Sequence, residues 1–87
     1  MHSTNQPHIE TELIQDIDRL RGELSLLMKR IEAHVEDQHH HAKATGDIDE
    51  MQRIVEAEPF RWLADAKHSL QTGFMFAQRA VTQPTTF

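Results

Sequence analysis

The sequence contains no cysteine, three glycines and three prolines, and these scarcities exclude several classes of protein. Without cysteine the chain has no disulfide, no thiolate metal ligand and no cysteine nucleophile, which fits a reducing cytosol. With so few glycines it has no glycine-rich loop to cradle phosphates. No apolar run approaches the ~18 residues of a membrane-spanning helix, and residues 1–7 are polar. We therefore expect a cytoplasmic protein with no membrane partner.

At 87 residues the chain has the length of one small domain. A domain of this size buries only about 60 to 65% of the surface that its unfolded chain exposes. Since no disulfide can compensate, we expect a second subunit to cover the remaining apolar surface. The sequence therefore predicts a homo-oligomer.

Acidic residues outnumber basic ones, for a formal net charge of −5 at pH 7. This balance argues against a DNA or RNA polymer as partner, because phosphate backbones require a basic surface. The charge is uneven, however: residues 1–59 hold six Lys or Arg against thirteen Asp or Glu, whereas residues 60–87 hold three against one. A bound anion is therefore expected on the C-terminal segment. The alternative is that three surface cations have no function.

Apolar residues recur at alternating spacings of three and four, which is typical of a helix with a coiled-coil-like packing row. The first helix is expected over about residues 8–43, after a disordered tail at residues 1–7. Its predicted seam, meaning the row of side chains that packs on the other long helix, begins with six apolar residues and continues with three polar ones. These are Leu13, Ile17, Leu20, Leu24, Leu27 and Ile31, then His34, Gln38 and His41.

Two short sequence features mark where the first helix ends and where a second and a third helix begin. Gly46 can end the first helix, and Asp47 opens a capping-box pattern for a short helix over about residues 48–57. Pro59 is suited to the first turn of a third helix, which we expect over about residues 59–82. A C-terminal tail follows at residues 84–87.

The third helix carries two rows at the same spacing. The first is Phe60, Leu63, Lys67, Leu70, Phe74, Ala77 and Val81, and the second is Trp62, Ala66, Ser69, Gly73, Phe76 and Ala80. One row can pack on the first helix while the other is left for a partner subunit or a flat ligand. The predicted fold is all-α, a single helical domain over residues 8–83. It is an antiparallel hairpin of two long helices with a short connecting helix, assembling into an oligomer. The alternative is a third helix wedged between the first two.

Histidines gather in the middle of the chain and suggest a metal site as one interpretation. They are His34, His39, His40 and His41, with Glu36, Asp37 and His68 as further ligands. Adjacent histidines fan around a helix, however, and the zinc-helix motif with its general-base Glu is absent. We predict no metal and no cofactor, and the metal site remains an alternative. Since neither Ser25 nor Ser69 stands in a nucleophile motif, we predict no catalytic residue and no enzyme.

The stretch 70–81 resembles the C-terminal helix of a family of small phage immune-evasion proteins, the anti-CBASS and anti-Thoeris cyclic-nucleotide sponges. The shared features are a leucine, an apolar residue before methionine, an aromatic residue, alanine, an amide, and alanine with a β-branched residue. Here they are Leu70, Phe74, Met75, Phe76, Ala77, Gln78, Ala80 and Val81. The histidine-rich middle departs from the family pattern.

The resemblance implies a hexamer of helical hairpins that traps cyclic di- and trinucleotides or cyclic ADP-ribose at subunit interfaces without cleaving them. Such a protein would block host antiphage signalling from the host cytoplasm. Its site needs cations for phosphates, flat side chains for bases and polar groups for base edges. The predicted ligand-binding residues are Arg61, Lys67 and Arg79, then Trp62, Phe74 and Phe76, then Gln71, Thr72 and Gln78. A small helical adaptor for a partner protein is the alternative.

Overall fold

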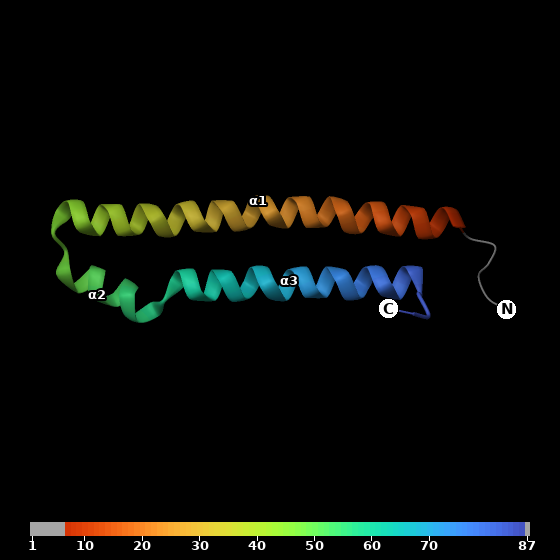
Figure 1. Cartoon of the computed structure of the whole chain (residues 1–87). Coiled ribbons are helices and arrows are strands. Elements are labelled where there is room, and N and C mark those ends of the chain that lie inside the picture. Colours follow the sequence, from red (N-terminus) through yellow and green to blue (C-terminus); the bar gives the residue numbers. More distant parts are fainter. Residues whose placement is uncertain (1–6, 87) are drawn as a thin grey trace.

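A computed structural model of the chain describes residues 7–86, which form three α-helices within that range (Figure 1). Helix α1 spans Pro7–Thr45, α2 spans Ile48–Ala57 and α3 spans Pro59–Thr82. The two long helices run antiparallel and side by side, and α2 joins them at one end. The predicted all-α hairpin with a short connecting helix is confirmed. Apart from Pro7, the tail predicted at residues 1–7 lies outside the described residues.

The turn between α1 and α2 is stabilised by local hydrogen bonds. Gly46 adopts the left-handed conformation that glycine tolerates, with φ of 66°. The amide of Asp47 donates to the carbonyl of Ala42 at 3.0 Å, and the Asp47 carboxylate accepts from the amide of Glu50 at 3.0 Å. This side-chain cap satisfies one of the free amides at the start of α2. Helix α2 therefore begins at the predicted residue, whereas α1 continues to Thr45, two residues beyond its predicted end.

The turn between α2 and α3 is tighter, because a single residue separates the two helices. Glu58 adopts a left-handed conformation with φ of 50°, and its amide donates to the carbonyl of Ile54 at 3.1 Å. Pro59 follows in the first turn of α3, where its missing amide is not needed. The chain reverses at the turn between α1 and α2, whereas here it only bends, so that α3 continues from α2 along α1 (Figure 1).

The buried core is small and lies where the three helices meet, which we call the closed end. Its buried apolar side chains are Val35 and Ala42 from α1, Ile54 from α2 and Leu63 from α3. Beside them the ring of His39 stacks on Phe60, with 5.6 Å between ring centroids and 20° between planes. The remaining length, the open end, is a two-helix hairpin. Among the described residues it contains half-buried side chains but no buried one.

The seam predicted on α1 is partly wrong. Leu13, Leu20 and Leu27 are 42 to 45% exposed, and His34 and His41 are also exposed. The buried or half-buried row on α1 includes Ile14, Ile17, Leu24, Met28, Val35 and Ala42. The alternating spacing permits both rows, and the difference is decided at the closed end. Val35 and Ala42 can be buried there without the cost of desolvating an imidazole, whereas His34 and His41 cannot.

On α3 the first predicted row faces α1 in its main members. Leu63 is buried, and Leu70, Phe74 and Val81 are half-buried. Phe60, also in this row, is 43% exposed. Both α2 and α3 pack on α1, so α3 is not wedged between the other two helices. No helix in the described part of the chain is long and apolar enough to cross a membrane.

Candidate ligand-binding groove

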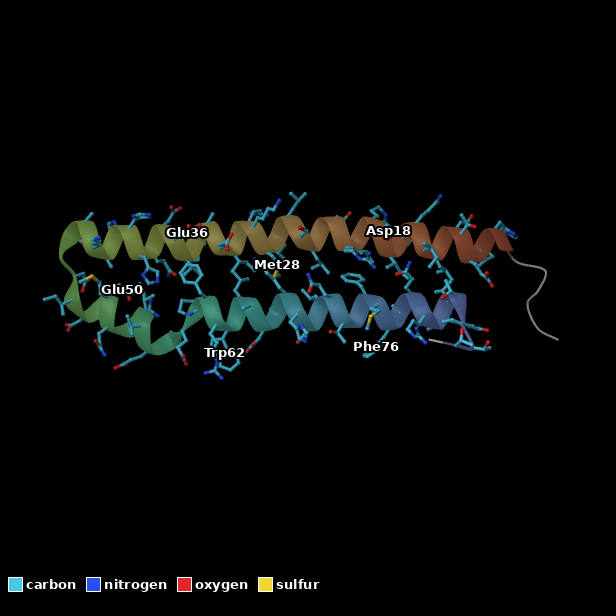
Figure 2. The ribbon with its side chains drawn as sticks, viewed as in Figure 1. Asp18, Met28, Glu36, Glu50, Trp62 and Phe76 are labelled. Atoms are coloured by element: carbon cyan, nitrogen blue, oxygen red, sulfur yellow. The ribbon has the colours of Figure 1, made fainter. Side chains whose placement is uncertain are left out.

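A groove of about 390 Å³ runs between the two long helices at the open end. We call it the α1–α3 groove. Its lining consists of Arg21, Leu24, Ser25, Met28 and Lys29 from α1 and Lys67, Leu70, Gln71 and Phe74 from α3. Met28 points toward α3 in the side-chain view (Figure 2). Apolar side chains from both helices thus form part of the lining, together with three cations.

Helical periodicity explains this mixed lining. On α1, Arg21, Leu24 and Met28 follow one another at spacings of three and four, which brings them onto one face. On α3, Lys67, Leu70 and Phe74 do the same. Each helix therefore contributes a cation in the same row as its packing residues. The aliphatic stem of such a cation can lie along the apolar surface while its charged group reaches water.

Two of the three cations contact specific partners. The guanidinium carbon of Arg21 lies 5.6 Å from the centroid of the Phe74 ring, and an Arg21 nitrogen lies 3.7 Å from a carboxylate oxygen of Asp18. The ammonium of Lys67 lies 3.9 Å from a carboxylate oxygen of Glu32 on the opposite helix. Lys29 forms no ion pair in the part of the chain that the structure describes. A flat cation against an aromatic ring, next to two ammonium groups, is suited to a ligand that combines phosphate with a flat ring system.

Three of the nine residues predicted to bind ligand lie together in this groove. They are Lys67, Gln71 and Phe74. Trp62 and Phe76 point away from α1 (Figure 2) and are 60% and 61% exposed.

The other four predicted residues also lie outside the groove lining. Arg61 pairs with Glu58 at 3.1 Å, and its guanidinium carbon lies 5.3 Å from the centroid of the Trp62 ring. Thr72 and Gln78 are half-buried, and Arg79 is exposed. Within one subunit these side chains do not converge on the groove.

The residues predicted from the sequence do not include the half of the groove that comes from α1. The acidic balance of residues 1–59 hides Arg21 and Lys29, and Ser25 stands out in the sequence only as a serine without a nucleophile motif. The sequence nevertheless contains a pattern that points to Arg21. Residues 14, 21, 28, 35 and 42 form a second row at heptad spacing beside the predicted seam, and Arg21 is its one charged member. Examining two rows on the first helix, as on the third, would have found Arg21.

A second hollow, of about 360 Å³, lies near the closed end. Its lining is His39, His40, Lys43, Met51 and Val55. The Nε2 atom of His39 is buried and has no hydrogen-bond partner. Among the described residues no group of three or more His, Asp or Glu side chains is arranged to hold a metal ion.

Comparison with known proteins gives one informative likeness. No protein-family model matches the chain. The chain is similar to the protein named anti-CBASS protein 2 of Pseudomonas phage JBD67, with 51% identity over 35 residues. The matched stretch covers 40% of this chain and 32% of the phage protein, so it spans about a third of that relative's length. Over that stretch the match supports the resemblance to anti-CBASS proteins that the sequence predicted.

Proposed function

We propose that this protein is a non-enzymatic sponge that binds cyclic di- and trinucleotide messengers and so blocks host antiphage signalling. The observation that carries the proposal is the α1–α3 groove. It joins cations Arg21, Lys29 and Lys67 with the ring of Phe74 and the amide of Gln71. The partial match to a phage protein named as anti-CBASS favours the same class of function.

The groove chemistry suits binding of a cyclic nucleotide. Phosphate oxygens accept charge-assisted hydrogen bonds from arginine and lysine, which are about twice as strong as neutral ones. The Phe74 ring and the Arg21 guanidinium offer flat surfaces for a base, and such stacking is worth about 1 to 3 kcal/mol per base. Gln71 and Ser25 can bond to base edges.

The same lining argues against hydrolysis. It contains no histidine, aspartate or glutamate that could act as a general base on water. A phosphodiester held there would keep its bonds. We therefore propose sequestration without cleavage, with no cofactor and no catalytic residue.

We further propose that the site is completed by other copies of the chain. The groove is open to solvent, and large apolar side chains remain exposed on both long helices. They include Leu13, Leu20, Leu27, Trp62 and Phe76. Burying them would give a homo-oligomer, and the family resemblance implies a hexamer. Residues such as Arg61, Trp62 and Phe76 would then reach a ligand from a neighbouring subunit.

Calorimetry with a panel of cyclic di- and trinucleotides tests the proposal. Arg21→Ala and Lys67→Ala should each weaken binding about ten- to a hundredfold, because each removes a bond to a charged group. Arg30→Ala is the matched control, since Arg30 lies on α1 outside the groove lining. Chromatography of the heat-released ligand should return it intact.

The contrary outcomes separate the alternatives. If no panel member binds wild-type protein, a helical adaptor that uses the exposed apolar side chains is the better interpretation. If Arg61→Ala or Arg79→Ala abolishes binding while Arg21→Ala and Lys67→Ala do not, the site lies outside the α1–α3 groove. Recovery of a linear nucleotide would show that the protein is an enzyme.

A further inference from the structure

We infer that Glu32 competes with the ligand for Lys67 and thereby lowers the affinity of the α1–α3 groove; this inference rests on the proposed function. Glu32 is not part of the groove lining, but its carboxylate lies 3.9 Å from the Lys67 ammonium. This pair joins α1 to α3. The other ion pairs that we find in the described chain connect residues three or four apart on one stretch of chain. Glu32 is thus the carboxylate placed to occupy a groove cation from the facing helix.

The geometry of the pair indicates that Glu32 competes with a ligand for Lys67 and does not hold the ammonium group in place for it. At 3.9 Å the nitrogen and oxygen are beyond hydrogen-bond distance, so the carboxylate does not fix the direction of the ammonium group. Both side chains are close to half exposed, and exposed ion pairs of this kind are weak. Breaking the pair therefore loses little positional order at Lys67. The remaining effect of Glu32 is the negative charge that it holds beside an incoming phosphate.

A phosphate that binds Lys67 competes with this carboxylate for the ammonium charge. The exchange replaces one anionic partner of Lys67 by another and leaves Glu32 near the ligand charge. Glu32 in this way partly neutralises the positive charge of the groove. Neutralising Glu32 removes both the competitor and the repulsion, so the affinity should rise.

Glu32→Gln tests this inference, with Glu23→Gln as the matched control. Glu23 is also an exposed glutamate on α1 and pairs with Arg19 at 3.8 Å, away from the groove lining. Both variants change the net charge equally. With cyclic diadenylate as the probe in calorimetry, we expect Glu32→Gln to bind about fivefold tighter than wild type. Glu23→Gln should differ from wild type by less than about twofold.

A double variant separates competition at Lys67 from the general electrostatic effect of removing one negative charge near the groove. In the Lys67→Ala background, Glu32→Gln should no longer tighten binding, because the contested cation is gone. A gain that persists without Lys67, a Glu32→Gln affinity no higher than that of Glu23→Gln, or weaker binding by Glu32→Gln would each overturn the inference. In those cases Lys67→Ala still reports on the proposed function. Circular dichroism confirms that each variant is folded. If neither wild type nor Glu32→Gln binds the probe or any other panel member, both proposals fail.

Discussion

The two ends of the hairpin differ in how completely they bury their side chains. At the closed end three helices meet, and each contributes a buried side chain, among them Ala42 at 1% and Ile54 at 2% exposure. At the open end two helices meet, and no side chain among the described residues is buried. A helix pair can cover only one face of each helix, whereas a third helix covers a further face. The closed end therefore has a hydrophobic core of its own, whereas the open end leaves large apolar side chains exposed.

The candidate site lies at the open end, where fewer side chains are buried. The α1–α3 groove and the exposed leucines Leu13, Leu20 and Leu27 all belong to the open end. Regions with few buried contacts open most readily, and binding sites are commonly found there. In this protein a ligand and neighbouring subunits would supply the burial that the hairpin lacks.

The largest expected effect is at the core of the closed end. Ile54→Ala should lower the free energy of unfolding by about 2 to 5 kcal/mol, because it leaves a cavity among three helices. Urea unfolding followed by circular dichroism measures this. Val55→Ala is the control: Val55 is next in sequence but 64% exposed, so its loss should cost less than about 0.5 kcal/mol. Equal effects of the two variants would mean that the closed end is not the stabilising core.

The next largest effect is expected on the oligomeric state, through the apolar side chains exposed at the open end. Wild-type protein should elute as a species well above the 10.1 kDa chain mass in light scattering coupled to gel filtration. Leu20→Glu should shift the mass toward that of one chain, because it places a charge in the apolar surface that we propose as a subunit interface. Asp18→Glu, on the same helix, is a control that keeps the charge. A single 10.1 kDa species for wild type at micromolar concentration would contradict the interfacial completion of the site.

The smallest of these effects is at the cap of α2. Asp47→Ala should cost about 1 kcal/mol, since it removes the acceptor for the Glu50 amide. Asp47→Asn should retain most of the stability because asparagine caps helices about as well as aspartate. Thermal melting of both variants compares them. A loss as large for Asp47→Asn as for Asp47→Ala would show that the carboxylate charge matters more than the hydrogen bond.

The helices were predictable because their signals are local. The caps at Gly46 and Asp47, the proline at the start of α3 and the apolar spacing depend on residues within one or two turns of each other. The structure extends α1 to Thr45, two residues beyond the expected end. Such small differences at helix ends are common because the last turn can begin or end at more than one residue.

The packing row on α1 was less predictable. The sequence offers two rows one residue apart, and the one that continues through His34 and His41 has the more regular apolar start. The other row is used because Val35 and Ala42 fit the closed end. Which of two such rows is buried depends on the side chains that the other helices bring, and these come from residues far along the chain.

The helical fold, the helix ends to within about two residues, and the cations and aromatic residues of the last helix could all be inferred from the sequence. The packing of α3 on α1 was needed to show that Lys67 and Phe74 face Arg21 across a groove while Trp62 and Phe76 face away from α1. It also decided that Glu32 lies beside Lys67. The physical reason is range: helix formation depends on neighbours in sequence, whereas a groove depends on the rotation and register of one long helix against another.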